Sequence, residues 1–247
     1  MKQPLKAVVL AAGKGTRLQT EGCDLPKVMR LANGRPLLQY VLDGLSFIER
    51  GNIIIVAGYQ KDTVIQAFPG YRFAIQTDQL GTGHAVMSAA ADLEGFDGAV
   101  LVCCGDMPLL RRETYEALVT VHLQNGNDCT ILTGTSDIPL PYGRIVRDNG
   151  GNFVRMVEDK DCRDDEKAIN ELNSGVYVFA AQKLLPALKC LGNNNAQREY
   201  YLTDVPAILL AEGTRVGICK RSLGFEMIGV NTIEQLNQVE KLLRGRE

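Results

Sequence analysis

Segments of two kinds alternate along the first half of the chain. Some are short apolar runs rich in β-branched residues, and such runs predict strands that are covered on both faces. We expect these strands at Leu5–Ala12, Asn52–Ala57, Tyr71–Gln76 and Ala99–Cys104. The others carry apolar residues at helical spacing, and we expect helices at Pro36–Ile48, Lys61–Phe68, Gly83–Leu93 and Arg112–Gln124. This alternation predicts a parallel α/β sheet with helices on both faces.

The second half of the chain has shorter strands and more turns. Arg144–Arg147 and Phe153–Glu158 flank Asp148-Asn149-Gly150-Gly151, which predicts an antiparallel hairpin because Asn and Gly tolerate a positive φ. Further strands are expected at Gly175–Ala180, Arg215–Lys220 and Met227–Val230, and helices at Lys183–Cys190, Asp204–Glu212 and Thr232–Leu243. Thr232 is the expected N-cap of the last helix. The charged run Asp159–Lys167 is interpreted as a solvated loop.

Composition and charge exclude several classes of protein. The chain has 247 residues, of which 45% are hydrophobic and 23% charged, so it is expected to fold around a sizeable core. Its formal net charge of -2 gives no overall field that would attract nucleic acid or an anionic membrane. The apolar run near the N-terminus is too short for a signal sequence or a membrane span. We therefore expect a cytoplasmic protein whose partners are small molecules, and the sequence leaves its oligomeric state open.

Cysteine and histidine usage argues against a metal cage built from these side chains. The 7 Cys include the adjacent Cys103 and Cys104, which alternation along a strand would point to opposite faces of the sheet. Their odd number and the lack of a C-x-x-C pair favour buried, reduced thiols. The 2 His, His84 and His122, are too few for a histidine-based metal site.

A glycine-rich loop follows the first strand. Leu10–Leu18 contains two glycines whose N–H groups can form an anion-binding turn, and Lys14 and Arg17, which can bond to phosphate oxygens. Leu18 stands where the third glycine of a G-x-G-x-x-G motif would be, and the spacing also differs from that of a P-loop. Phosphate binding at the carboxyl end of this strand is one interpretation, and an ordinary glycine turn is the other.

Lys27 is a second candidate phosphate ligand. It follows Leu25-Pro26, and the proline stiffens the segment that carries the lysine. A solvated lysine is the alternative, and this alternative loses ground if the loop folds back over the crevice at the end of the first strand.

Gln76 and the glycines after it are candidates for reading a base. The segment Gln76–His84 follows a predicted strand and leads into an Ala-rich helix. The planar amide of Gln76 offers a donor and an acceptor, which suits a pyrimidine edge, and the glycines allow a ring to lie against the backbone. His84, in the first turn of the helix, is interpreted as a structural residue.

Asp106 is the candidate metal ligand. It follows a buried strand, where a carboxylate is costly unless a cation meets it, and Mg²⁺ with phosphates is a natural partner. Asn231, after Met227–Val230, would add a neutral oxygen, and such a sparse pair is sufficient because Mg²⁺ keeps several waters. Helix capping is the alternative for both residues.

Taken in order, these segments resemble the sugar-phosphate nucleotidyltransferases. The resemblance runs from about Leu5 to Val239 and is greatest to the uridyltransferase domain of the bifunctional N-acetylglucosamine-1-phosphate uridyltransferase/glucosamine-1-phosphate acetyltransferases. The segments that carry it are Leu10–Leu18, Leu25–Lys27, Gln79–Ala85, Gly105–Asp106, Tyr142–Ile145, Asn170–Gly175, Glu199–Asp204 and Gly229–Asn231. Their fixed order is far more specific than any single segment.

The resemblance implies a Rossmann-like, GT-A-like α/β fold, with a mixed, mostly parallel sheet and a small antiparallel sugar-binding lobe. It implies one nucleotidyltransferase domain over residues 1–247. Within that domain we expect a nucleotide-binding half over about 1–125, a sugar-phosphate-binding lobe over about 126–230 and a closing helix over 231–247.

The resemblance also implies roles for residues at matching positions. The nucleotide would be bound by Leu10, Ala11, Ala12, Gly13, Gln76, Gly81 and Thr82. The sugar phosphate would be bound by Cys104, Gly105, Gly143, Glu158, Asn173 and Asn231. Arg17, Lys27 and Asp106 would be catalytic, and Asp106 and Asn231 would hold Mg²⁺.

The implied reaction is the condensation of UTP with N-acetylglucosamine 1-phosphate to UDP-N-acetylglucosamine and pyrophosphate, by Mg²⁺-assisted in-line attack on the α-phosphorus. It would belong to nucleotide-sugar and cell wall biosynthesis. A sister enzyme for glucose 1-phosphate or dTTP, and a non-catalytic nucleotide-sugar sensor, remain alternatives.

The sequence departs from the family pattern in three places. Cys104 stands where many relatives carry a larger, often aromatic residue, and the loop Gln19–Cys23 looks slightly long. A hexapeptide-repeat acetyltransferase half is expected to be absent. These departures put the fit of the sugar pocket and the second activity of the relatives in doubt.

Overall fold

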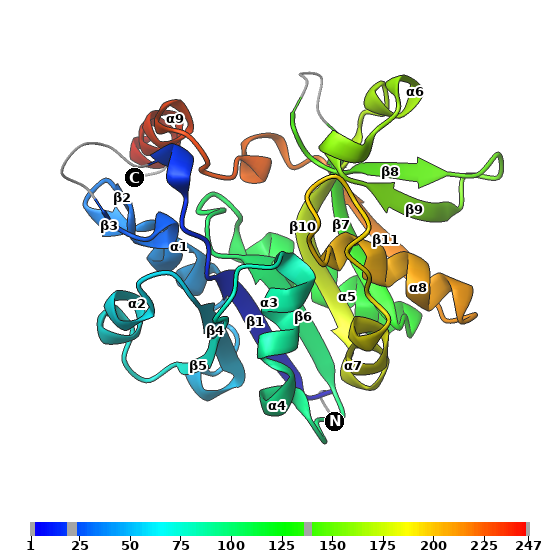
Figure 1. Ribbon diagram of the computed structural model, residues 1–247, viewed down its shortest axis with the longest axis horizontal. Coiled ribbons are helices and arrows are strands. Elements are labelled where there is room, and N and C mark those ends of the chain that lie inside the picture. Colours follow the sequence, from blue (N-terminus) through cyan, green and yellow to red (C-terminus); the bar gives the residue numbers. More distant parts are fainter. Residues whose placement is uncertain (1–2, 19–23, 136–139, 246–247) are drawn as a thin grey trace.

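The computed structural model describes residues 3–18, 24–135 and 140–245. Its centre is a mixed sheet in which seven strands follow the order β11-β7-β10-β6-β1-β4-β5, with the hairpin β8–β9 attached through β10 (Figure 1). The strands are β1 (Leu5–Ala11), β4 (Ile53–Ala57), β5 (Arg72–Ile75), β6 (Ala99–Cys104), β7 (Cys129–Thr135), β8 (Arg144–Arg147), β9 (Phe153–Val157), β10 (Glu171–Ala180) and β11 (Val216–Arg221).

The predicted mixed, mostly parallel sheet is confirmed. β5, β4, β1 and β6 run parallel to one another, and β11 runs parallel to β7. β10 is antiparallel to both β6 and β7, so it is the reversed strand of the seven. The β8–β9 hairpin forms at the predicted Asn-Gly turn, and its two strands are antiparallel.

Helices cover both faces of the sheet, as the alternating pattern predicts. The α-helices of the described residues are α1 (Leu37–Gly44), α2 (Lys61–Ala67), α3 (Thr82–Ser88), α4 (Ala90–Leu93), α5 (Arg112–Asn125), α6 (Asp164–Lys167), α7 (Ala181–Lys189), α8 (Val205–Ala211) and α9 (Ile233–Arg244). Along β1, Ala7 and Val9 pack in the core that holds α1, α2 and α5. Val8 packs in the core that holds α3, α4, α7 and α8. Successive side chains of a strand point to opposite faces of the sheet, so a separate core forms on each face.

The last helix joins the two ends of the sequence. Leu236, Val239 and Leu243 of α9 form a third core with residues of the N-terminal part, among them Leu18 and Ala32. Figure 1 shows α9 beside the small hairpin of β2 (Leu31–Ala32) and β3 (Arg35–Pro36). This packing brings the segment before α9 next to the end of β1, which positions the site.

Two expectations about elements are wrong, and one strand was not expected. Met227–Val230 is not a strand, because the N–H of Gly229 bonds to the Tyr142 hydroxyl and that of Val230 to the Asp106 carbonyl. The strand β7 was not predicted at all. The charged run Asp159–Lys167 is not a solvated loop throughout, because it contains α6, and Glu166 is buried and ion-paired with Arg155.

β10 begins earlier than predicted and carries a bulge. Its pairing with β7 shifts register between Asn173 and Tyr177, where Gly175 has a φ of +75°. Glycine suits this backbone because it has no Cβ. Within the parts of the chain that the structure describes, every helix is too short or too polar to cross a lipid bilayer.

Candidate active site

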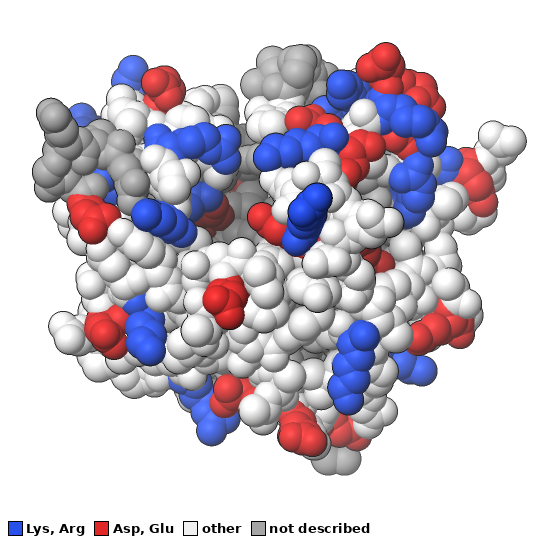
Figure 2. All heavy atoms as spheres, in the orientation of Figure 1, with Lys and Arg blue, Asp and Glu red and all other residues white. Residues whose placement is uncertain are grey.

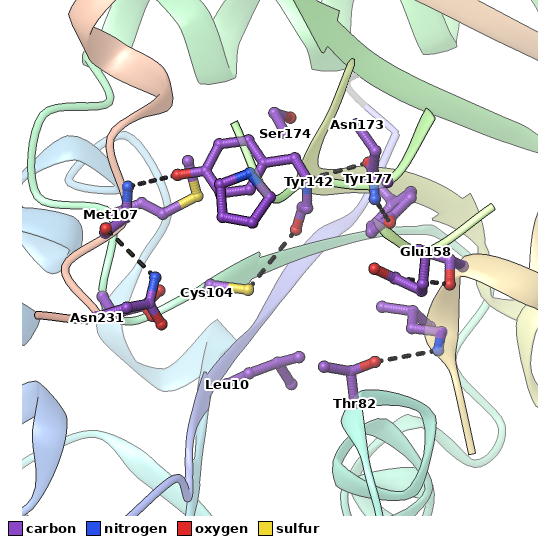
Figure 3. A pocket seen from close by; sticks show the side chains of 17 residues that line it. Leu10, Thr82, Cys104, Met107, Tyr142, Glu158, Asn173, Ser174, Tyr177 and Asn231 are labelled. Carbon is purple, nitrogen blue, oxygen red and sulfur yellow. Dashed lines mark hydrogen bonds between the residues drawn. The ribbon is translucent and has the colours of Figure 1, made fainter. Parts of the chain in front are cut away.

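Two adjoining cavities open where β1 and β6 end. The first, of about 180 Å³, is lined by Leu10, Thr82, Cys104, Asp106, Met107, Pro141, Tyr142, Gly143, Glu158, Asn173, Ser174, Gly175, Tyr177, Leu202, Thr203, Gly229 and Asn231 (Figure 3). The second, of about 230 Å³, is lined by Leu10, Ala12, Gly13, Lys27, Val28, Gln76, Gln79, Gly81, Thr82, Ala85, Cys104, Asp106 and Glu199. The molecule is hollowed on this face, and both acidic and basic side chains border the hollow (Figure 2).

Lys27 lies between the two predicted metal ligands. Its Nζ donates to the Asp106 carboxylate and, over 2.7 Å, to Oδ1 of Asn231. The side chains of Lys27 and Asp106 are 16% and 17% exposed. Nδ2 of Asn231 donates to the Gly229 carbonyl over 3.3 Å, so Oδ1 of Asn231 faces the Lys27 ammonium. One carboxylate and one amide oxygen therefore converge on a single cation.

The loop after β1 folds over Lys27, as the phosphate-binding interpretation requires. Gly15 has a φ of +68°, and a Cβ there would lie 2.7 Å from Cβ of Lys27. Only glycine allows so close an approach of the two backbones. The interpretation of Lys27 as a freely solvated side chain is wrong.

Helix capping does not explain Asp106 or Asn231. Thr232 caps α9 as predicted, since its hydroxyl accepts from the Gln235 N–H over 3.3 Å. α5 begins beyond Asp106, and the carboxylate of Glu226 accepts from the Arg111 N–H at its start over 3.0 Å. The side chains of Asp106 and Asn231 therefore cap neither helix and are available to bind a ligand.

The oxygens of Asp106 and Asn231 fit Mg²⁺. Hard oxygen ligands suit this ion, which commonly takes only one or two protein ligands and keeps several waters. Among the described residues, no group of three or more His, Cys, Asp or Glu side chains is placed to hold a metal ion. Asp106 and Asn231, which Lys27 bridges, would therefore supply two protein ligands, as expected for an ion that also binds phosphates.

The amide of Gln76 is fixed in one orientation. Its side chain is buried, and Nε2 lies 3.1 Å from the Gly81 carbonyl and 3.1 Å from Nδ1 of His84. No described residue donates to Oε1, so the oxygen is the free group of this amide. The sequence predicts that Gln76 offers a ligand both a donor and an acceptor. In the structure both hydrogens of Nε2 are used within the protein, so Gln76 offers a ligand the acceptor Oε1.

The segment Tyr200–Leu202, from the second half of the chain, holds the turn after Gln76 by hydrogen bonds. The N–H of Tyr200 bonds to the Leu80 carbonyl over 2.8 Å, and the Tyr200 carbonyl accepts from the Gly83 N–H over 2.8 Å. Gly81 has a φ of +107°, and a Cβ there would lie 2.7 Å from the Tyr200 oxygen. The N–H of Leu202 bonds to the Thr82 hydroxyl over 3.1 Å. The sequence motif around Tyr200 thus has a bracing role that sequence reasoning missed.

Asn173 lines the first cavity at the start of the β10 bulge. Its Oδ1 accepts from the Gly175 N–H over 3.0 Å, and its Nδ2 donates to the Tyr177 hydroxyl over 2.6 Å. One hydrogen of Nδ2 is left over for a ligand. Figure 3 shows Asn173 and Glu158 on one side of the cavity and Asn231 on the other.

Glu158 is a partly buried carboxyl at the wall of the first cavity. Burial raises its pKa, as do the carboxylates of Asp204, Asp161 and Asp159, while a hydrogen bond from Thr203 opposes the rise. The Thr203 hydroxyl donates to Oε1 over 2.9 Å. Thr203 was not predicted, although it belongs to the same motif as Tyr200.

The structure brings most of the predicted residues together, with some exceptions. Arg17 is exposed and lines neither cavity. Ala11 and Gly105 are buried and line neither cavity, although the Gly105 N–H bonds to the Leu10 carbonyl over 2.9 Å and so ties β6 to β1. The loop Gln19–Cys23 lies outside the described residues.

The cysteines that the structure describes differ in exposure, so the expectation that all of them are buried is wrong. The described cysteines are free; Cys103, Cys129 and Cys219 are buried, Cys104 and Cys162 are half-buried, and Cys190 is exposed. Burial raises the pKa of the Cys104 thiol well above its usual range. Cys104 therefore presents an uncharged thiol to both cavities.

This combination of a mixed Rossmann-like sheet with a polar site at its strand ends is that of a nucleotidyltransferase. The family model of the MobA-like NTP transferase domain matches residues 7–204, and the chain belongs to this family. The bifunctional protein GlmU of Pelotomaculum thermopropionicum is 43% identical over 243 residues, 98% of this chain and 52% of that protein. GlmU of an Exiguobacterium species is 45% identical over 242 residues, 97% of this chain and 53% of that protein. The chain spans about half the length of these curated relatives.

A solved structure confirms the fold. A protein from Bacillus anthracis assigned as a glucose-1-phosphate thymidylyltransferase, in complex with sucrose, superposes with a TM-score of 0.74. The match covers 98% of this chain and 96% of that chain, at 18% sequence identity.

Proposed function

We propose that this chain transfers a uridylyl group from UTP to N-acetylglucosamine 1-phosphate, giving UDP-N-acetylglucosamine and pyrophosphate. The observation that carries the proposal is the ammonium of Lys27 in the second cavity, which is held by Asn231 of the first cavity and by Asp106, a residue that lines both. The identity of 43% and 45% to two GlmU proteins over this region supports it.

Each cavity has one substrate. The second would take the nucleotide through Leu10, Ala12, Gly13, Gln76, Gly81 and Thr82, and the predicted Ala11 lies buried in β1 between Leu10 and Ala12. The first would take the sugar phosphate through Cys104, Gly143, Glu158, Asn173 and Asn231, and the predicted Gly105 lies buried next to Cys104. Asp106 lines both, so the reacting phosphates would meet beside it.

The reaction requires no protein nucleophile. A phosphate oxygen of the sugar 1-phosphate attacks the α-phosphorus of UTP, and the bond from that phosphorus to the bridging oxygen of the leaving pyrophosphate breaks in line. The site holds two polyanions in this arrangement, so positioning and charge stabilisation supply the rate. Lys27 would lie against the transferred and leaving phosphates, and Arg17 would join it from the exposed loop.

Asp106 and Asn231 would hold the divalent cation of the reaction, for which we propose Mg²⁺. When bound, it supplies positive charge to phosphate oxygens and orients them. The Lys27 ammonium already bonds to these two side chains, and triphosphate oxygens offer it new partners.

The free oxygen of Gln76 favours uracil over cytosine. Uracil has an imide N–H, which can donate to Oε1, whereas the ring nitrogen of cytosine at that position is an acceptor. Thymine has the same imide N–H, so Gln76 does not separate UTP from dTTP. A related enzyme for dTTP or glucose 1-phosphate therefore remains the second candidate.

The test is the release of pyrophosphate from UTP and N-acetylglucosamine 1-phosphate, with and without Mg²⁺. We expect turnover that chelation by EDTA abolishes and Mg²⁺ restores. A higher kcat/KM with dTTP or glucose 1-phosphate would assign the sister activity instead. A thermal shift with UDP-N-acetylglucosamine but no turnover of any substrate would contradict an enzyme and favour a sensor.

A further inference from the structure

His84 lies behind Gln76 and contacts its amide from outside both cavities. It lines neither cavity, and its Nδ1 is 3.1 Å from Nε2 of Gln76. The Ser88 hydroxyl donates to the His84 carbonyl over 3.0 Å, and the ring of Tyr200 lies 6.3 Å from the imidazole, centroid to centroid. His84, in the first turn of α3, therefore lies close to both Gln76 and the segment that carries Tyr200.

The two neighbours of the amide nitrogen fix which way the amide faces. The Gly81 carbonyl can only accept a hydrogen bond, so the group of Gln76 that faces it over 3.1 Å must be Nε2. The second hydrogen of Nε2 is then directed at Nδ1 of His84, which must accept it. Neutral imidazole with the proton on Nε2 meets this requirement.

We propose that His84 is a specificity-determining positioning residue, which keeps the Gln76 oxygen toward the base and so excludes cytosine. This proposal rests on the proposed nucleotide site. Without an acceptor at the position of Nδ1, one hydrogen of a buried amide has no partner, and the amide loses part of its preference for this orientation. In the flipped amide the nitrogen faces the base, and cytosine then finds a donor.

The experiment measures UTP and CTP binding by calorimetry, and pyrophosphate release with each nucleotide, for the wild type and three variants. His84→Phe keeps an aromatic ring but removes the acceptor. His84→Asn places an amide oxygen near the position of Nδ1. Ser88→Ala is the matched control on the same helix, because it removes only the bond to the His84 carbonyl.

We expect the wild type to prefer UTP over CTP by about a hundredfold, and His84→Phe to reduce this ratio to about tenfold or less. The loss should appear in the affinity and KM for nucleotide, with a smaller change in kcat. His84→Asn should restore most of the preference, and Ser88→Ala should keep it. In ¹⁵N NMR of the wild type, Nδ1 of His84 should be the unprotonated nitrogen.

An unchanged UTP-to-CTP ratio in a folded His84→Phe protein would overturn the inference, as would a protonated Nδ1 or a wild type without preference for UTP. The failure of the proposed function looks different. In that case the wild type binds UTP in preference to CTP, with the same dependence on His84, but releases no pyrophosphate.

Discussion

The ammonium of Lys27 pairs with a carboxylate of the site and also faces the cavity proposed for the nucleotide. It neutralises Asp106, a carboxylate that is only 17% exposed. An ion pair of this kind removes the cost of leaving a buried charge alone. Lys27 is also the one described lysine or arginine that lines either cavity. The same side chain is therefore available to substrate phosphates.

Substitutions at this ion pair should affect the chemical step. We expect Lys27→Ala and Asp106→Ala each to lower kcat on the order of a hundredfold, or about 3 kcal/mol in the barrier. Steady-state pyrophosphate release with saturating UTP and Mg²⁺ measures this. Lys183→Ala, which removes an exposed lysine from α7, is the matched control and should leave kcat unchanged. Near-native turnover in both site variants would contradict the assignment.

Glu158 should give the affinity for sugar phosphate a pH dependence. Burial, with three neighbouring carboxylates, raises its pKa above the ordinary value of 4.5. The carboxylate that would accept from sugar hydroxyls in the proposed reaction is therefore lost as the pH falls through this raised pKa, and KM for the sugar phosphate should rise there. Glu158→Gln should have a higher KM at neutral pH and lack this rise, because its amide does not titrate. The same acid limb in the variant would show that another group causes it.

At the scale of elements, the start of α9 places Asn231. Oε1 of Gln235, in the first turn of the helix, accepts from the N–H groups of Asn231 and Thr232 over 2.7 and 3.1 Å. Because Thr232 and Gln235 satisfy each other in a capping box, the side chain of Asn231 is free to face Lys27. The cap of this helix thus orients a residue of the site.

Removing the cap should lower both stability and activity. We expect Thr232→Ala to reduce the free energy of unfolding by about 1 kcal/mol, measured by urea denaturation. Its kcat should also fall, since Asn231 loses the fixed helix start that holds it. Thr232→Ser keeps the hydroxyl and should retain both properties. If Thr232→Ala loses stability but keeps full kcat, the cap does not position Asn231.

The elements that could be predicted are those with local causes. The apolar runs of β1, β4 and β6 are buried on both faces, so their sequence alone indicates strands. β7 contains Thr130 and Thr133, which are buried because His122 and Glu171 bond to their hydroxyls. These partners lie elsewhere in the chain, and no local pattern reveals them.

The same distinction holds for the site. Asp106 and Gln76 follow predicted strands, so their place at the sheet edge could be predicted. The bond of Gln76 to His84 and the brace from Tyr200 could not, because they depend on side-chain rotamers and on a segment more than a hundred residues away. Arg17, predicted from its spacing in the glycine loop, is exposed on its short helical turn.

At the scale of the whole molecule, His122 couples folding to pH. It is 2% exposed, and its Nδ1 lies 3.0 Å from the Thr130 hydroxyl. The Asn127 amide donates to that hydroxyl over 2.9 Å, so the hydroxyl hydrogen is free for the imidazole. Burial lowers the pKa of His122 from 6.5 to about 4, and Asp128 opposes this only in part. The native state therefore keeps His122 neutral over a range where the unfolded chain protonates it.

Stability should fall as the medium is acidified through this range. Between pH 6.5 and about 4 the unfolded state binds a proton that the native state does not, so the free energy of unfolding should decrease by about 3 kcal/mol. Urea titrations from pH 7 to 4 measure this. His122→Gln should lack this part of the slope, and the difference between the two curves separates it from the contribution of carboxylates. Parallel curves would contradict a lowered pKa.

Of the residues that the structure describes, the two cavities share Leu10, Thr82, Cys104 and Asp106, and the other lining residues belong to one cavity or the other. Gln76 belongs to one wall, and Glu158 and Asn173 belong to the other. If the proposed function holds, mutations that alter the preferred base can accumulate without disturbing the preferred sugar, and the reverse is also true. A scaffold built in this way can diversify one half of its product at a time, in natural evolution or in the laboratory.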